Sequence, residues 1–400
     1  MDPMFQDLMR EATRLTREGR LDDATRVIQR ALGGAAAAAA ERRAAPAGTG
    51  RPGSGAGAEV LDGCIVEVPS RALPARPRPP RAPDAAGPKG GDAFTEAFVT
   101  PFAAPFAEPV TDTDVDAHPD GAFIAGRHAH GGMSRDYKLY VPPGATGRAL
   151  PLVVMLHGCT QDPDDFAAGT GMNERAREQG FFVLYPAQSR KANAQGCWNW
   201  FKHTHQQRHR GEPALIASMT QAIVQRHRID PRRVYIAGLS AGGAMAAVVA
   251  ACWPELFAAV GVHSGLAPGA ATSLPEALAA MRGGVPAGTR GMPVAVPTIV
   301  FHGDRDATVH PDNGARMVAA ATPAAPDRSE QGTAGAGRRW TRHVHGASGA
   351  GPEVEHWVVH GAGHAWSGGQ RAGSYTDPSG PDATGEMLRF FFEQGRGATH

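Results

Sequence analysis

From about Gly121 onward, short apolar segments alternate with segments of helical length. Most of these segments are four or five apolar residues long and bounded by turn residues, which is typical of buried parallel strands, whereas the first, 135–141, alternates like a half-exposed strand. Such alternation predicts an α/β fold, with a mostly parallel sheet and helices on both of its faces. The expected strands are 135–141, 152–156, 181–185, 234–237, 258–262, 298–301 and 355–359, and the expected helices are 164–179, 213–226, 241–251 and 382–392.

The chain before this domain has a different composition. Apolar residues recur at helical spacing on both sides of Gly19, which predicts a short helical hairpin within 1–32. One such unit cannot bury its apolar face alone, so we expect it to dock on a partner, a second copy or the main domain. A loosely ordered extension is the alternative. Residues 33–118 are rich in Ala, Gly and Pro and predict a linker, followed by the α/β domain over 119–395.

Charge and cysteine usage exclude several classes of protein. Forty Lys and Arg residues against 39 Asp and Glu residues give a net charge of +1, which argues against a nucleic-acid partner. The four cysteines contain no C-x-x-C pair, and the histidine-rich run 203–209 has no neighbouring cysteine or carboxylate ligands. We therefore expect no metal and no structural zinc, and interpret the run as a solvated loop.

Two further patterns bear on location. No apolar stretch is long enough to span a membrane, so no transmembrane segment is expected. The first residues lack the basic start and apolar run of a signal peptide, which predicts a cytoplasmic protein. A misassigned start codon, and hence an exported protein, is the alternative.

A G-x-S-x-G pattern spans 238–242, with Ser240 at its centre. An apolar strand is expected before it and an Ala-rich helix after it. Small neighbours let the chain turn sharply at the serine, and the helix N-terminus places N–H groups near an oxyanion formed on an attacked carbonyl. A serine with a purely structural role in the turn is the alternative, but this context favours a nucleophile.

A serine hydroxyl becomes a good nucleophile only with a base and an orienting acid, which should follow it in the order acid, then histidine. Asp304 and Asp306 compete for the acid role, and the more distant Asp306 is favoured because its loop can turn back toward the histidine. His364 lies in a glycine-flanked loop and is favoured as the base over His356 and His360, which lie on or at the end of a strand.

The remaining requirement is a pair of oxyanion donors. Cys159 follows the expected strand 152–156, so a turn there can direct its backbone N–H at the substrate carbonyl. The second donor would be the N–H of Ala241, next to the serine. Because the proposed donor is backbone, the side chain of Cys159 is free to be a buried thiol.

Aromatic residues gather in the loops that carry these groups. Trp198, Trp200, Phe201 and Trp366 would suit an apolar acyl chain if they line a cleft beside the serine. Ordinary packing is the alternative for each of them. We expect Trp198, Trp200, Trp366 and Gln161 to contact the substrate.

Six motifs resemble, in the same order, those of the polyhydroxybutyrate depolymerase family of esterases. They are HGCTQ at 157–161, YPAQ at 185–188, GCWNWF at 196–201, GLSAGGAM at 238–245, HGD at 302–304 and GHAWSGG at 363–369. The resemblance runs from about Phe123 to Phe392. It implies an α/β-hydrolase fold, a Ser240–Asp306–His364 triad, no cofactor, and hydrolysis of ester bonds in poly- or oligo-(3-hydroxybutyrate) through an acyl-enzyme.

The resemblance leaves other functions open. Related esterases act on feruloyl or acetyl esters of plant polysaccharides, and a non-catalytic protein bound to storage granules is a third hypothesis. The missing signal-peptide pattern favours a cytoplasmic or granule-associated enzyme, with the N-terminal region as a candidate granule contact, although many family members are extracellular. The resemblance also places the loops of Cys159 and Cys197 beside the active site, which predicts that the two cysteines are close and leaves their redox state open.

Overall fold

In a computed structural model of the chain, the described residues are 121–284, 291–335, 337–346 and 352–394, with Glu11, Arg14 and Val27 from the N-terminal region. The predicted helical hairpin and linker therefore lie almost wholly outside the described residues, and their boundaries stay predictions. Val27 is buried and belongs to one of the two core clusters of the α/β domain. In the part of the chain that the structure describes, no helix has the length and apolar character needed to cross a membrane.

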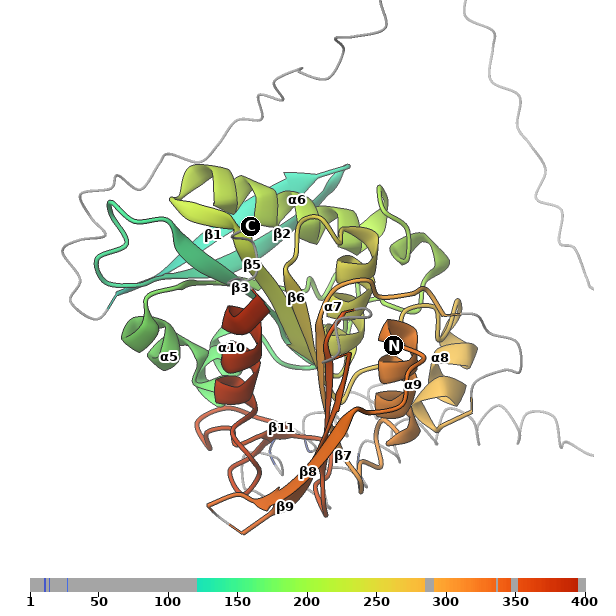
Figure 1. Ribbon diagram of the computed structural model, residues 1–400. Helices are drawn as coiled ribbons and strands as arrows, with labels where there is room; N and C mark the ends of the chain where they lie inside the picture. Colours follow the sequence, from blue (N-terminus) through green and yellow to red (C-terminus); the bar gives the residue numbers. More distant parts are fainter. Residues whose placement is uncertain are drawn as a thin grey trace, which may run out of the picture. The chain divides into compact units, whose positions relative to one another are not determined.

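The described residues form a ten-stranded sheet, shown in Figure 1. Its order is β1 (Ala122–His130), β2 (Met133–Val141), β4 (Phe182–Pro186), β3 (Leu150–Leu156), β5 (Ile229–Leu239), β6 (Ala259–His263), β7 (Thr298–Gly303), β10 (Val354–Val359), β9 (Arg339–His345) and β8 (Arg328–Thr333). The strands from β4 to β10 pair in parallel. The outer pairs at both edges are antiparallel. The predicted α/β fold with a mostly parallel central sheet is confirmed.

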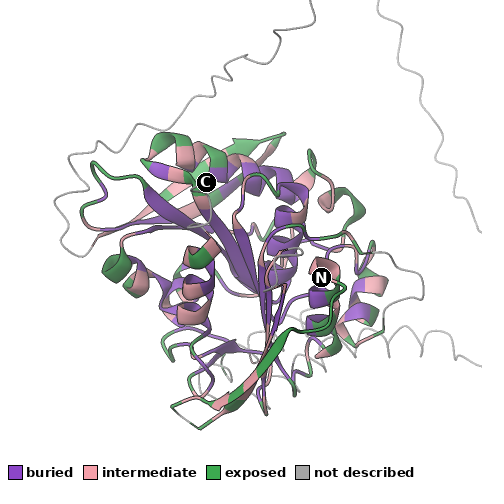
Figure 2. Cartoon of the chain, in the orientation of Figure 1, coloured by how far each residue is buried: buried purple, intermediate pink, exposed green. Residues whose placement is uncertain are grey.

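Helices cover both faces of this sheet. Successive residues of a strand point to opposite faces, so a central strand contributes side chains to the apolar cluster on each face. In β3, Leu152 and Val154 belong to one apolar cluster, and Val153 and Met155 belong to the other. The first cluster includes residues of α6 (Gly211–Arg226), α7 (Ala241–Cys252), α8 (Leu274–Met281) and α9 (Asp312–Ala321). The second includes residues of α4 (Pro163–Thr170), α5 (Met172–Gln179) and α10 (Ala383–Gln394). Figure 2 shows the resulting buried sheet between partly exposed helices.

The structure differs from the predicted elements in several places, and β1, β8, β9, α8 and α9 match no predicted strand or helix. The single helix expected over 164–179 is two helices, because Gly171 between them adopts a left-handed conformation with φ 64°. The β8–β9 hairpin extends the sheet at one edge and lies outside every predicted element. β8 has the sequence RSEQGT and is largely exposed, so it carries no apolar pattern from which a strand could be predicted.

Candidate active site

Ser240 is the single residue between the end of β5 and the start of α7. Its backbone has φ 58° and ψ −121°, a conformation that L-residues adopt only under strain. Its N–H donates to the carbonyl of His263 at 2.8 Å, which holds the turn against β6. A Cβ atom on Gly242 would lie 2.0 Å from the carbonyl oxygen of Leu156, so only glycine lets the turn approach the end of β3.

Asp306 and His364 meet at the ends of the neighbouring strands β7 and β10. Nδ1 of His364 lies 2.7 Å from Oδ2 of Asp306. The other carboxylate oxygen of Asp306 accepts from the N–H groups of Thr308, at 2.9 Å, and Val309, at 2.8 Å. Burial alone would raise the pKa of Asp306, but His364, His302 and the N–H of Val309 outweigh burial and leave the pKa below its usual value. Asp306 is therefore held as a carboxylate next to the histidine.

Asp304, the competing candidate, faces a different histidine. Its Oδ2 lies 2.9 Å from Nδ1 of His360, and its Oδ1 accepts from the N–H of Gly361 at 2.6 Å. Nε2 of His360 is in turn 2.9 Å from the hydroxyl of Thr341. Asp304 thus connects the loop after β7 to the loop that leads to His364. The other histidine candidates are also engaged elsewhere, since His356 lies partly buried in β10 and His360 faces Asp304.

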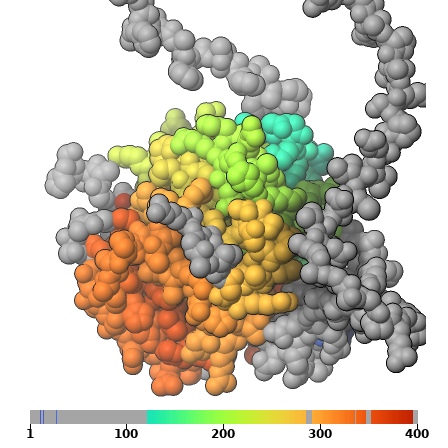
Figure 3. All heavy atoms as spheres, turned by 90° about the vertical axis from the view of Figure 1, so that its right-hand side faces the viewer, coloured from blue at the N-terminus to red at the C-terminus, as the bar shows by residue number. Residues whose placement is uncertain are grey.

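Ser240 and His364 line the same pocket, of about 410 Å³. Most of its wall is apolar and comes from α8, the loop after β6 and the loop that carries Cys197. The lining side chains include Trp200, Phe201, Leu266, Leu274, Leu278, Met281, Val309 and Tyr375. Leu274, at the start of α8, is 54% exposed, so the apolar wall reaches the surface. Figure 3 shows the face of the molecule on which α8 and α9 lie, coloured gold to orange.

The predicted oxyanion donors also border this pocket. Cys159 and Ala241 both line it. Cys159 and Cys197 form a disulfide with a Cα–Cα distance of 4.2 Å, so the predicted proximity is confirmed. Cys159 and Ala241 therefore border the pocket that Ser240 lines, and their role as oxyanion donors stays a prediction.

The four residues predicted to contact substrate divide into two pairs. Trp200 and Gln161 line the pocket. Trp198 and Trp366 do not, and the structure contradicts that part of the prediction: both side chains are buried in the core, and Nε1 of Trp366 donates to the hydroxyl of Thr384 at 3.0 Å. Trp198 and Trp200 lie in the same loop, yet only Trp200 lines the pocket, and the sequence alone does not show which way each side chain points.

Gln161 also holds the pocket wall together. Its side-chain oxygen accepts from the N–H of Gly158 at 2.9 Å, and its side-chain nitrogen donates to Asp165 and to the carbonyl of Ser374 at 3.1 Å each. These bonds connect the turn of Cys159 to the loop of Tyr375. The side chain therefore has a structural task at the position where substrate contact was predicted.

Sequence reasoning missed several residues that shape this region. His263 is fully buried, and burial together with His302 and His364 lowers its pKa to about 3, so it is neutral. Its Nε2 accepts from the N–H of Ser367 at 2.9 Å, which fixes the strand that follows His364. The four residues of α8 that line the pocket were missed as well, although the spacing of Leu274, Leu278 and Met281 is a helical signal.

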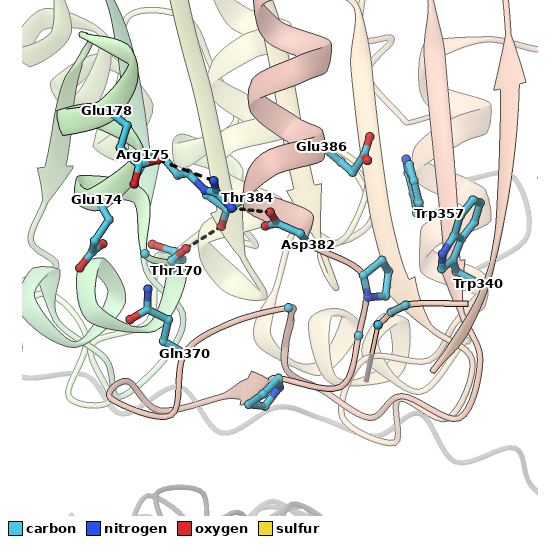
Figure 4. A pocket seen from close by; sticks show the side chains of 17 residues that line it. Thr170, Glu174, Arg175, Glu178, Trp340, Trp357, Gln370, Asp382, Thr384 and Glu386 are labelled. Atoms are coloured by element: carbon cyan, nitrogen blue, oxygen red, sulfur yellow. Dashed lines mark hydrogen bonds and ion pairs between the residues drawn. The ribbon is translucent and has the colours of Figure 1, made fainter. Parts of the chain in front are cut away.

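A second hollow, of about 660 Å³, lies beside the N-terminal end of α10 and is shown in Figure 4. Its wall is mostly polar, with carboxylates from α5 and α10, and Trp340 and Trp357 on the other side. Arg175 donates to Asp382 across it at 2.8 Å. Neither Ser240 nor His364 lines this hollow, so it is separate from the candidate active site.

Among the described residues, no group of three or more His, Cys, Asp or Glu side chains is arranged to hold a metal ion.

The sheet order, the strained serine turn and the adjacent Asp306–His364 pair define an α/β-hydrolase fold with a serine-centred site. Residues 135–322 match the family described as esterase PHB depolymerase. This part of the chain is similar to that family.

Several curated proteins are similar to the chain. It is 35% identical over 242 residues to poly(3-hydroxyalkanoate) depolymerase C of Paucimonas lemoignei, covering 56% of this chain and 57% of that protein. It is 32% identical to feruloyl esterase B of Neurospora crassa, covering 34% of this chain and 47% of that protein. Among solved structures, the acetyl xylan esterase from Aspergillus awamori matches 57% of this chain and 89% of its own, with a TM-score of 0.49 and 23% identity. The chain thus spans only about half the length of these two curated relatives.

Proposed function

We propose that the chain is a serine esterase that hydrolyses ester bonds of poly- or oligo-(3-hydroxybutyrate) through an acyl-enzyme. One arrangement carries this proposal: Ser240 on a strained strand-to-helix turn shares an apolar pocket with His364, which is paired with Asp306. Nucleophilic ester hydrolysis needs a hydroxyl that attacks, an imidazole that removes its proton and a carboxylate that orients the imidazole.

In the proposed acylation step, His364 removes the proton of the Ser240 hydroxyl as its oxygen attacks the ester carbonyl. The hydrogen bond between Nδ1 of His364 and Asp306 leaves Nε2 as the atom that accepts this proton. Asp306 then stabilises the imidazolium. The proton passes to the leaving alkoxide, which departs as an alcohol and leaves the acyl group on Ser240.

The negative charge on the carbonyl oxygen is stabilised by the N–H groups of Cys159 and Ala241. Water, deprotonated by His364, then attacks the acyl-enzyme, and the same two amides receive the second oxyanion. The serine is regenerated and a carboxylic acid leaves. Apart from water, each step uses groups of the residues around the pocket.

The apolar wall formed by Leu266, Leu278 and Val309 favours a short aliphatic acyl group. An aromatic or carbohydrate ester is the second candidate, because feruloyl esterase B and acetylxylan esterase A of Emericella nidulans are also similar to this chain, the latter at 28% identity over 197 residues. Hydrolysis rates on amorphous poly(3-hydroxybutyrate) granules, methyl ferulate and acetylated xylan, measured side by side, separate the two.

The test of the mechanism is pre-steady-state hydrolysis of p-nitrophenyl butyrate. We expect a burst of nitrophenol equal to the enzyme concentration wherever deacylation limits turnover, and no hydrolysis by a folded Ser240→Ala variant. An equally active Ser240→Ala variant would refute the mechanism. Wild-type protein that adsorbs to granules without hydrolysing any ester would support a non-catalytic granule-binding protein instead.

If stored polymer is the substrate, the protein should fractionate with the cytoplasm or with granules. Its recovery only from the culture medium would contradict that location and favour an extracellular substrate.

A further inference from the structure

Glu212, in the first turn of α6, is a fully buried carboxylate that none of the proposed catalytic steps uses. A buried charge is costly unless it is paired and hydrogen-bonded. Glu212 meets this condition: it accepts from Arg135 at 3.1 Å, from Gln188 at 2.6 Å, and from the backbone and side-chain nitrogens of Asn199 at 2.7 Å and 2.8 Å. Nδ1 of His205 lies 3.4 Å away. One side chain thus connects segments from four parts of the chain.

The first connection runs through Gln188 to the turn that carries Cys159. The backbone N–H of Gln188 donates to Nε2 of His157 at 3.1 Å, and Nδ1 of His157 lies 2.8 Å from the carbonyl of Gly158. His157 is buried, and burial lowers its pKa, so the ring stays neutral and can accept from Gln188. Glu212 therefore sets the position of Gln188. Gln188 in turn fixes His157, which immediately precedes the turn of Cys159.

The second connection runs through the loop of Cys197. Asn199 is held by both of its bonds to Glu212, and the side-chain nitrogen of Gln188 donates to the carbonyl of Cys197 at 3.0 Å. Cys197 is joined to Cys159 by the disulfide. The N–H of Thr160 also donates to the carbonyl of Gln195, in the same loop, at 2.8 Å. The first connection therefore reaches the chain on the N-terminal side of Cys159. The second reaches Cys159 itself and the residue that follows it.

We propose that Glu212 is a positioning residue for the oxyanion donor: it holds the Cys159 turn through Gln188 and through the disulfide-linked 195–199 loop. This inference rests on the proposed function, since it assigns a purpose to the N–H of Cys159 in ester hydrolysis. Glu212 does not line the pocket and does not contact the reacting atoms. It acts only through the geometry of the turn, so its loss should weaken transition-state binding more than substrate binding.

The four hydrogen bonds also explain why this residue carries a charge. A carboxylate is an acceptor at both oxygens, whereas the amide of glutamine would direct two N–H donors at the surrounding donors. Glu212→Gln is nearly the same size as the native residue, so it changes hydrogen bonding without opening a large cavity. A matched control is Glu355→Gln, because Glu355 is a buried carboxylate in β10 that pairs with Arg389 at 2.7 Å and lies outside the pocket lining.

The experiment compares wild type, Glu212→Gln and Glu355→Gln in hydrolysis of p-nitrophenyl butyrate and in inhibition by an alkyl trifluoromethyl ketone. The inhibitor forms a tetrahedral oxyanion on Ser240 and so reports on the oxyanion donors. For Glu212→Gln we expect kcat to fall about tenfold or more, with the inhibitor constant weakened by a similar factor and KM within about twofold. For Glu355→Gln we expect lower stability but unchanged kcat and inhibitor affinity per folded molecule.

Unchanged kcat and inhibitor affinity in folded Glu212→Gln would overturn the inference, as would an equal loss in Glu355→Gln. If Glu212→Gln does not fold, Asn199→Ala carries the test, because it removes one bond to Glu212 and keeps the others. A parallel loss of kcat and inhibitor affinity then supports the inference, and unchanged values of both overturn it. Failure of the proposed function would be distinct, since the wild type itself would then hydrolyse no ester or Ser240→Ala would remain active.

Discussion

The two sides of the candidate active site are held in different ways. On one side, His364 and Asp306 lie in loops after β7 and β10, fixed by hydrogen bonds to nearby backbone and by Asp304 across the two loops. On the other side, the turn of Cys159 is fixed by a disulfide and by a buried carboxylate about fifty residues away along the chain. Contacts between residues far apart along the chain hold both sides. The side of His364 is held by bonds between the two loops themselves, whereas the turn of Cys159 also depends on Glu212, which does not line the pocket.

The largest expected effect tests the side of His364. Asp306→Asn should lower kcat/KM for p-nitrophenyl butyrate by about a thousandfold or more, because an amide cannot stabilise the imidazolium and can favour the wrong tautomer. Asp304→Asn is the matched control and should cost about tenfold or less, since Asp304 only ties two loops together. Equal losses in the two variants would leave the acid unassigned and would contradict the proposed division of roles.

Removal of the Cys159–Cys197 disulfide tests the side of the site that carries the Cys159 turn. Cys197→Ser should lower the free energy of unfolding by about 4 kcal/mol, because the bond closes a loop with a sequence separation of 38. The loss of kcat should be much smaller than in Asp306→Asn, since the bonds of Glu212 still hold the turn. Chemical denaturation and steady-state kinetics measure both. Cys252→Ser is the control, as Cys252 is a buried free cysteine, and an equal loss of stability there would show that the bond itself contributes little.

As the pH falls, His263 and Glu212 should lose their contributions to the free energy of unfolding over different pH ranges. The pKa of buried His263 is about 3, below its usual value of 6.5. Between these two pH values the unfolded chain therefore binds a proton at this residue and the folded chain does not. Stability from this group is complete above about pH 6.5 and is lost as the pH falls toward 3. The hydrogen bonds of Glu212 outweigh the effect of its burial and lower its pKa from 4.5 to about 2, so its stabilisation is lost only as the pH falls from 4.5 toward 2.

This difference can be measured as the free energy of unfolding from pH 7.5 to 3.5. His263→Gln should remove part of the loss that begins near pH 6.5, on the order of a few kcal/mol over the range, whereas Glu212→Gln should leave that part intact. Both variants should be less stable than wild type at neutral pH. A His263→Gln curve parallel to that of wild type would mean that His263 does not set the acid sensitivity.

The smallest expected effect concerns the pocket wall. Trp200→Ala should raise KM for p-nitrophenyl butyrate several-fold, equivalent to about 1 kcal/mol, because Trp200 lines the pocket. Trp198→Phe, which keeps an aromatic ring in the core, should leave KM unchanged. A higher KM in Trp198→Phe than in Trp200→Ala would reverse the assignment of the two tryptophans.

The sequence by itself determined the fold class, and its motifs indicated Ser240, Asp306 and His364. Strand and helix patterns are local, and the reacting groups must stand next to strand ends, so their neighbours along the chain identify them. The choice of Asp306 over Asp304 also followed from loop position, and the structure pairs Asp306 with His364.

Only the tertiary structure decided what surrounds these groups. Whether Trp198 or Trp200 faces the pocket depends on how a loop folds over the core, and the helical break at Gly171 depends on packing. Glu212 was invisible in the sequence because a lone glutamate at a helix start usually faces solvent. It is buried here because donors from Arg135, Gln188 and Asn199 converge on it, and that convergence exists only after distant segments have packed together.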